Sequence, residues 1–223
     1  MASTSRSQTE AIHAALQQRI LNGEIPQGHR LVVRAYADEF GTSDLPVREA
    51  IRRLEGDGLV EVHQYRGARV RRLEPGEIPG TYIVRGELEG LATRLAGPHL
   101  TADDLDELRQ LNEQMRTTAA KGEPADYNGL NHRFHELIFG RCPYPEVTDT
   151  ITRIWDVQAA FGMVFSIDHE RMTASINEHD EIIASLAQGD WQLAGEQARR
   201  HKWSVACSLL EALGMEPPDD LTS

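Results

Sequence analysis

The segment YADEFGTSDLPVREAI, residues 36–51, decides the fold of the N-terminal part of this chain. A short helix fits residues 34–40, and Gly41 ends it. Ser43 is a favourable N-cap for the next helix, which we expect to run to about Glu55. Two short helices separated by three residues are typical of a helix-turn-helix.

The flanking segments extend this motif to a winged helix. Upstream, apolar residues at helical spacing predict a helix over residues 8–22. Downstream, residues 59–62 and 68–71 alternate as β-strands do, around a turn at residues 63–67. We therefore expect a winged helix-turn-helix domain over residues 1–73.

Arginines give the second helix of the motif a basic face. Arg48, Arg52 and Arg53 are charged, whereas apolar residues at helical spacing, Val47, Ile51 and Leu54, are expected to face inward. Such a helix can enter the major groove of DNA, where arginine bonds guanine through two hydrogen bonds. The wing adds four more arginines: Arg66, Arg69, Arg71 and Arg72. A solvated charged helix explains this charge pattern equally well.

The overall charge does not argue against DNA binding, because it is unevenly distributed. The 223 residues carry a net charge of −12. Residues 1–72 hold 11 Arg and 9 Asp plus Glu, a balance of +2, so the remaining residues carry −14. Such asymmetry indicates two parts with different tasks.

After a linker at residues 74–79, the sequence predicts helices only. Six amphipathic segments fit, at about residues 80–98, 102–120, 126–140, 146–165, 171–188 and 191–213. They predict a mainly α protein whose second domain, residues 80–214, is an antiparallel helical bundle, followed by a frayed tail at 215–223. Neither a membrane span nor a secretion signal is apparent, and the two cysteines form no paired motif, so we expect a cytoplasmic protein with free thiols.

Three histidines of the helical part share faces with apolar residues. His135, His179 and His201 lie on three separate predicted helices, each flanked by apolar residues at helical spacing. Imidazoles that converge inside a bundle are a common way to bind a divalent metal. Each histidine alone is more simply explained as an ordinary buried residue, but three together favour the metal hypothesis.

The N-terminal motifs resemble the DNA-binding domain of the GntR family. The resemblance is nearly continuous over residues 20–70 and rests on IPQGHRL at 25–31, the segment at 36–51, and LEGDGLV at 54–60. It implies that a common set of residues contacts DNA: Arg34, Ser43, Asp44, Leu45, Arg48, Arg66 and Gly67. The family usually has Arg and Thr where this chain has Asp44 and Leu45. Because aspartate accepts from cytosine and repels phosphate, we expect an operator that differs from the usual half-site.

The helical part resembles the FCD sensor domain that accompanies this DNA-binding domain in one GntR subfamily. The resemblance covers about residues 78–213 and rests on Val84-Arg85-x-x-Leu88-Glu89, Asn131-x-x-x-His135, Glu178-His179 and His201. It implies a metal bound by Asn131, His135, His179 and His201, with zinc favoured and nickel, manganese or iron left open. It also implies a small organic acid as effector, held by Arg85, although an exposed or helix-paired arginine is equally compatible with the sequence.

These resemblances imply a homodimeric transcription regulator, and more specifically a repressor, that binds a palindromic double-stranded operator under the control of a small carboxylate. Two alternatives remain. One is a regulator that responds directly to the metal. The other is a metal-dependent hydrolase, which the sequence disfavours because His135-Glu136 lacks the second histidine of a zincin motif and Glu136 points away from the His135 face.

Overall fold

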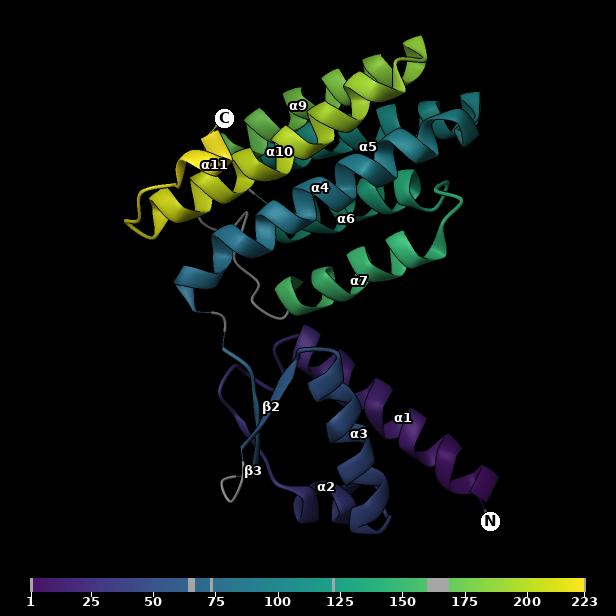
Figure 1. Ribbon diagram of the computed structural model, residues 1–223, viewed down its shortest axis with the longest axis vertical. Helices are drawn as coiled ribbons and strands as arrows, with labels where there is room; N and C mark the ends of the chain where they lie inside the picture. The colour runs from purple at the N-terminus through teal and green to yellow at the C-terminus, as the bar shows by residue number, and fades with distance from the viewer. Residues whose placement is uncertain (1, 64–66, 73, 122, 160–168, 223) are drawn as a thin grey trace. The chain divides into compact units, whose positions relative to one another are not determined.

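The computed structural model describes residues 2–63, 67–72, 74–121, 123–159 and 169–222 (Figure 1). It is mainly α-helical with one small antiparallel sheet, which confirms the predicted fold class. The chain divides into two compact units, the first built mainly from residues before Glu74 and the second mainly from residues after it. None of the described helices has the length and apolar character that a membrane span requires.

The first unit is organised around three helices, α1 (Ala2–Leu21), α2 (Val33–Glu39) and α3 (Asp44–Gly56). The apolar positions expected to face inward are buried: Ile12, Leu16 and Ile20 on α1, and Val47, Ile51 and Leu54 on α3. Burial of aliphatic side chains stabilises a fold by about 1.5–3 kcal/mol each. This core fixes α3 as a packed rod whose opposite face carries the arginines.

The turn between α2 and α3 follows the sequence prediction closely. Gly41 has φ of 62°, a left-handed conformation that glycine adopts without steric cost. Ser43 is the N-cap residue of α3, as expected, but its side chain makes no capping hydrogen bond. Ser43 is exposed at the start of α3.

The wing is a three-stranded antiparallel sheet with the order β1-β3-β2. The strands β2 (Val60–His63) and β3 (Gly67–Val70) form the predicted hairpin, paired from Val60 opposite Val70 to His63 opposite Gly67. The strand β1 (Arg30–Leu31) was not predicted, because two residues are too few to show an alternating pattern. It completes the sheet on the outer edge of β3.

The second unit contains the helices α4 (Ile78–Ala96), α5 (Ala102–Lys121), α6 (Pro124–Phe139), α9 (His169–Gln188), α10 (Trp191–Ala212) and α11 (Asp219–Thr222), while α7 spans Pro145–Ala159. Two expectations need correction. Residues 75–77 of the predicted linker form a 3₁₀ turn and α4 begins at Ile78. The tail expected to fray ends in α11, where Leu221 is buried. Residues 160–165 of the predicted fourth helix lie outside the described residues.

The contacts among five helices of this unit close a ring. Going round it, α4 packs against α6, α6 against α5, α5 against α9, α9 against α10, and α10 again against α4. A closed ring directs one face of each helix toward a shared interior. Residues far apart in the sequence therefore meet at its centre.

Glycines bring α4 and α10 into backbone contact. A Cβ atom at Gly90 would lie 2.7 Å from the carbonyl oxygen of Gly195, and a Cβ at Gly195 would lie 2.7 Å from the carbonyl oxygen of Gly90. Any side chain at either position would therefore push the helices apart. This close crossing sets the distance between the side chains that α4 and α10 direct into the ring.

Gly90→Ala is expected to destabilise the protein by about 1–3 kcal/mol, because its Cβ meets backbone that lacks room to move. The matched control is Gly129→Ala on α6, where a Cβ would meet nothing within 4 Å among the described residues. That substitution should stabilise by about 0.5–1 kcal/mol, since alanine is the better helix former. Urea unfolding of both variants checks the prediction, and equal effects would contradict it.

Candidate metal centre and DNA-binding surface

Three buried histidines meet at the centre of the helical ring. His135 comes from α6, His179 from α9 and His201 from α10, and each is at most 3% exposed. The ring centroids lie 5.1 Å apart for His135 and His179, 5.3 Å for His135 and His201, and 4.7 Å for His179 and His201. One ring nitrogen from each lies within 4.8 Å of those of the other two, so the three can share one ion.

The orientation of His179 is set by Asn112 of α5. The Asn112 amide nitrogen donates to the backbone oxygen of Ile176 at 3.0 Å and to the carboxylate of Asp180 at 2.6 Å. Its oxygen therefore faces Nδ1 of His179, 3.2 Å away, and accepts the proton there. The Nε2 atom of His179 is left with a lone pair, and it has no hydrogen-bond partner among the described residues.

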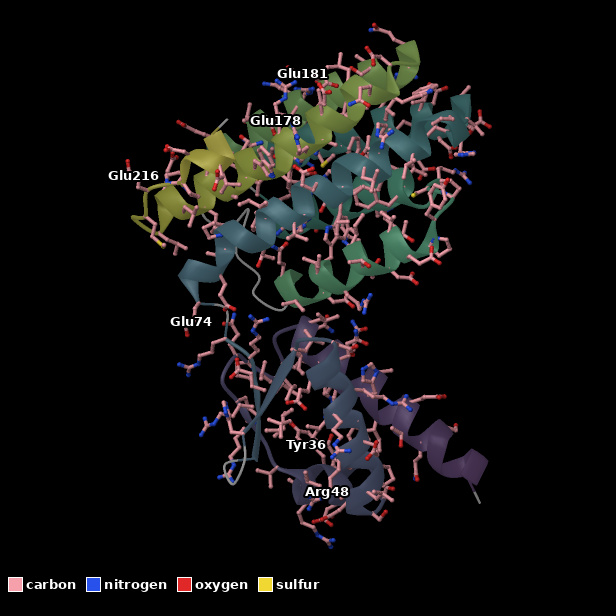
Figure 2. All side chains as sticks on the ribbon, viewed as in Figure 1. Tyr36, Arg48, Glu74, Glu178, Glu181 and Glu216 are labelled. Carbon is pink, nitrogen blue, oxygen red and sulfur yellow. The ribbon has the colours of Figure 1, made fainter. Side chains whose placement is uncertain are left out.

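His201 is oriented in the same way by a carboxylate. Its Nδ1 lies 2.5 Å from Oε2 of Glu178, which also pairs with the buried Arg171. Glu178 belongs to α9 and is labelled in Figure 2. The Nε2 atom of His201 is buried without a hydrogen-bond partner in the described part of the chain. A carboxylate or amide behind an imidazole is the usual support of a metal-binding histidine.

His135 has a different neighbour, the ammonium of Lys202. The Lys202 nitrogen lies 2.9 Å from Nε2 of His135 and 3.3 Å from Oε2 of Glu89 on α4. Lys202 and Glu89 are both buried, at 4% and 0% exposure. Sequence reasoning missed Lys202, because lysine is rarely buried and nothing local distinguishes this one.

The residues present fit a divalent metal. Besides the two unpartnered imidazole nitrogens, Oδ1 of Asn131 is buried and makes no hydrogen bond to any described residue. Asn131 precedes His135 by one turn of α6. Buried polar atoms are normally paired, so the unpaired nitrogens of His179 and His201 are available to a ligand.

The electrostatic environment keeps the imidazoles neutral. Burial lowers the pKa of His135, His179 and His201 well below the usual value of 6.5, and the positive charge of Lys202 lowers it further. Burial also lowers the pKa of Lys202, to about 8. At neutral pH the histidines therefore present lone pairs and Lys202 is mostly an ammonium.

Arg85, the predicted effector residue, lies on α4 and is buried. Its guanidinium contacts Oε1 of Glu89 through Nε at 2.7 Å and through Nη2 at 2.6 Å. It also lies over the ring of Tyr82, 5.4 Å from the centroid. Through Glu89 it is connected to Lys202 and so to the histidines.

Most residues expected to contact DNA lie exposed around the start of α3. Figure 2 shows Arg48 where α2 and α3 meet. Arg34, Ser43, Leu45 and Arg48 are exposed, Leu45 at 62%, which is high for a leucine. Asp44 is half-buried between two of the arginines, with its carboxylate 3.7 Å from Arg34 and 3.7 Å from Arg48. The three charges therefore form one cluster.

The wing contributes a second basic position, which sequence reasoning missed. Arg30 on β1 lies directly opposite Arg69 on β3, and both are exposed. Like charges directly opposite are destabilising in a sheet unless an anion lies between them. Gly67, also expected to contact DNA, is exposed with φ of 79°, whereas Arg66 lies outside the described residues.

Comparison with known proteins finds a matching family pattern for each of the two parts of the chain. The pattern of bacterial regulatory proteins of the gntR family matches residues 8–70, and the pattern of the FCD domain matches residues 81–202. The HTH-type transcriptional regulator McbR of Escherichia coli is 27% identical over 187 residues, covering 82% of this chain and 84% of McbR. A probable D-xylose utilization operon transcriptional repressor of Paenarthrobacter nicotinovorans is 26% identical over 185 residues, covering 82% and 80%.

Solved structures show the same fold. The structure of E. coli McbR/YncC superposes with a TM-score of 0.70 at 24% identity, covering 93% of this chain and 97% of the other. A putative transcriptional regulator GntR from Rhodococcus sp. RHA1 gives 0.71 at 22% identity, covering 92% and 98%. The chain belongs to the gntR family of bacterial regulatory proteins, carries an FCD domain, and is a DNA-binding transcription regulator rather than an enzyme.

Proposed function

We propose that this regulator binds its operator as a homodimer, and that a metal and a small carboxylate bound inside the helical ring control that binding. The observation that carries the proposal is the pair of unpartnered nitrogens among the clustered histidines, Nε2 of His179 and Nε2 of His201, together with the buried and unpartnered Oδ1 of Asn131, within the described residues. Such atoms cost free energy unless a ligand pairs with them.

Asn131, His135, His179 and His201 would hold the metal. Three imidazoles and one amide oxygen are ligands that suit zinc, with nickel, manganese and iron as alternatives. A divalent metal would supply positive charge and further coordination positions to which a carboxylate can bind. Because Asn131 is neutral, a bound carboxylate would provide the negative charge that the ligand set lacks.

The charges around the histidines favour an anionic effector. Three cations, Arg85, Arg171 and Lys202, are buried in this region, against two carboxylates, Glu89 and Glu178. With neutral histidines the balance is +1, and a divalent metal would raise it to +3. Buried charge is costly unless it is compensated, so a small carboxylate stabilises the loaded site. Arg85 is proposed to contact it, in exchange for part of its pairing with Glu89.

The DNA-binding unit supports sequence-specific binding to double-stranded DNA. A dimer would place two α3 helices in successive major grooves, which requires a palindromic operator. The relative from P. nicotinovorans is described as a probable repressor, and this favours repression for the present chain. Effector binding would then change the operator affinity by stabilising one dimer arrangement over another.

Purified protein tests the proposal in three steps. Metal analysis should give about one equivalent per chain, organic acids should raise the melting temperature of the loaded protein, and those acids should change its operator affinity. A metal that changes operator affinity without any acid would instead identify a direct metal sensor. Protein without metal at any step would overturn the metal part of the proposal.

Operator binding is expected to weaken steeply as salt rises, because arginine contacts with phosphate release counterions. Arg30→Ala should lower affinity for all sequences alike and reduce the slope of log affinity against log salt by about 1. Arg109→Ala removes an exposed arginine of α5 and is the matched control. Fluorescence anisotropy at several salt concentrations measures the slopes. An unchanged slope in Arg30→Ala would exclude Arg30 from the phosphate contacts.

A further inference from the structure

The one buried lysine of the helical ring lies against a proposed metal ligand. Lys202 follows His201 on α10, is 4% exposed, and has its ammonium nitrogen 2.9 Å from Nε2 of His135. The chain contains only one other lysine, Lys121, which is exposed at the end of α5. A buried ammonium among three imidazoles is unfavourable by itself, so its position calls for a reason.

The contact occupies a nitrogen of His135 that must act as an acceptor. An ammonium has donors only, so Nε2 of His135 must accept from it. A neutral imidazole that accepts at Nε2 carries its proton on Nδ1, and its single in-plane lone pair is then the one that Lys202 holds. His179 and His201 differ from it, because their Nε2 atoms have no hydrogen-bond partner among the described residues. A metal can therefore bind two imidazoles directly, but has to displace Lys202 from the third.

Glu89 provides the place to which Lys202 can move. Its Oε2 lies 3.3 Å from the Lys202 nitrogen, while its Oε1 is held by Arg85. The close crossing of α4 and α10 at Gly90 and Gly195 keeps this carboxylate near α10. A small rotation of the lysine side chain would exchange its bond to His135 for a shorter one to Glu89.

We propose that Lys202 is an internal competitor of the metal for His135, and that Glu89 is the acceptor that receives Lys202 when the metal binds. This inference rests on the proposed metal centre. The competition makes the site weaker and more readily exchanged than the same ligands would be without the lysine. Its occupancy would then follow the supply of free metal, so that the regulator releases metal as well as binding it.

The first test measures zinc affinity of the full-length protein by competition with a chromophoric chelator. Lys202→Met nearly keeps the length of the side chain and removes its charge. The variant protein should bind zinc at least about tenfold more tightly than the wild type, because substitutions of residues that contact a metal ligand change metal affinity on this scale. Lys121→Met is the matched control and should match the wild type. Unchanged or weaker binding in Lys202→Met would overturn the proposal.

A second variant should change affinity in the opposite direction. Glu89→Gln removes the negative charge that receives Lys202, so zinc affinity should fall by about tenfold. The double variant Lys202→Met/Glu89→Gln should bind as tightly as Lys202→Met, since Glu89 acts through the lysine. A double variant as weak as Glu89→Gln would show that Glu89 supports the metal without Lys202.

The wild-type protein offers a test that does not depend on the folding of variants. With ¹³C-labelled lysine the ε-methylene groups should give two signals, because the chain has two lysines. Zinc should shift the Lys202 signal and leave that of Lys121 in place. Zinc bound at one equivalent with no shift would exclude the displacement of Lys202, whereas no zinc binding in any variant would overturn the metal centre itself.

Discussion

His179→Ala should lower the zinc affinity of the protein by more than about 100-fold. Even the loss of a residue that hydrogen-bonds to a metal ligand lowers metal affinity by about 10- to 100-fold, and here the ligand itself is removed. The Nε2 atom of His179 is buried and has no partner within the described residues, and its ring lies about 5 Å from the rings of His135 and His201, at 5.1 and 4.7 Å between centroids. Its removal leaves two imidazoles and an amide. Zinc competition titrations and metal analysis of the purified variant measure the loss.

Two further substitutions separate metal binding from simple structural support. Asn112→Ala removes the acceptor behind Nδ1 of His179 and should reduce affinity by about 10- to 100-fold, less than the ligand itself. His132→Ala changes an exposed histidine of the same helix as His135 and should have no effect. Operator affinity of metal-free His179→Ala should stay close to that of the metal-free wild type. If metal content, folding and DNA binding fell together, His179 would only hold the fold.

The histidines could be predicted because helical periodicity places a residue on a face. His135, His179 and His201 each share a face with apolar residues, and all three are buried at the ring centre. The burial of each histidine follows from its local sequence alone. Asn131 was inferred from resemblance, and the structure adds that its side-chain oxygen is buried.

Two residues that contact the histidines, Asn112 and Lys202, could not be predicted from the sequence. Asn112 lies 67 positions from His179, and Lys202 lies 67 positions from His135. No local pattern encodes contacts at such separations; they follow from the order of helices around the ring. Arg30 was missed for a related reason, since its position opposite Arg69 depends on a two-residue strand.

The winged helix was predicted more completely because its signals are local. The glycine after α2, the N-cap position of α3 and the apolar positions of α3 all lie within 20 residues. The same proximity did not reveal the cluster of Arg34, Asp44 and Arg48, which joins two helices across the turn. From that cluster we predict a role for Asp44 in how DNA is read.

Asp44→Arg should change the base preferred by the operator half-site. Asp44 lies in the first turn of α3, beside the exposed Leu45, and its carboxylate can accept from the amino group of cytosine. Arginine at this position would instead donate to guanine. The preference between the two bases should shift by about 1–3 kcal/mol, which corresponds to about 5- to 150-fold in affinity. Selection from random duplexes with both proteins measures the change.

The same substitution should also strengthen binding to unrelated DNA, because it removes a carboxylate that pairs with Arg34 and Arg48 and repels phosphate. Asp38→Arg makes the same change of charge on α2, beside Arg34, and is the matched control. It should raise nonspecific affinity without altering the selected base. Identical half-sites for the wild type and Asp44→Arg would mean that Asp44 only adjusts the charge of this surface. A base change confined to Asp44→Arg would instead assign operator specificity to the first turn of α3.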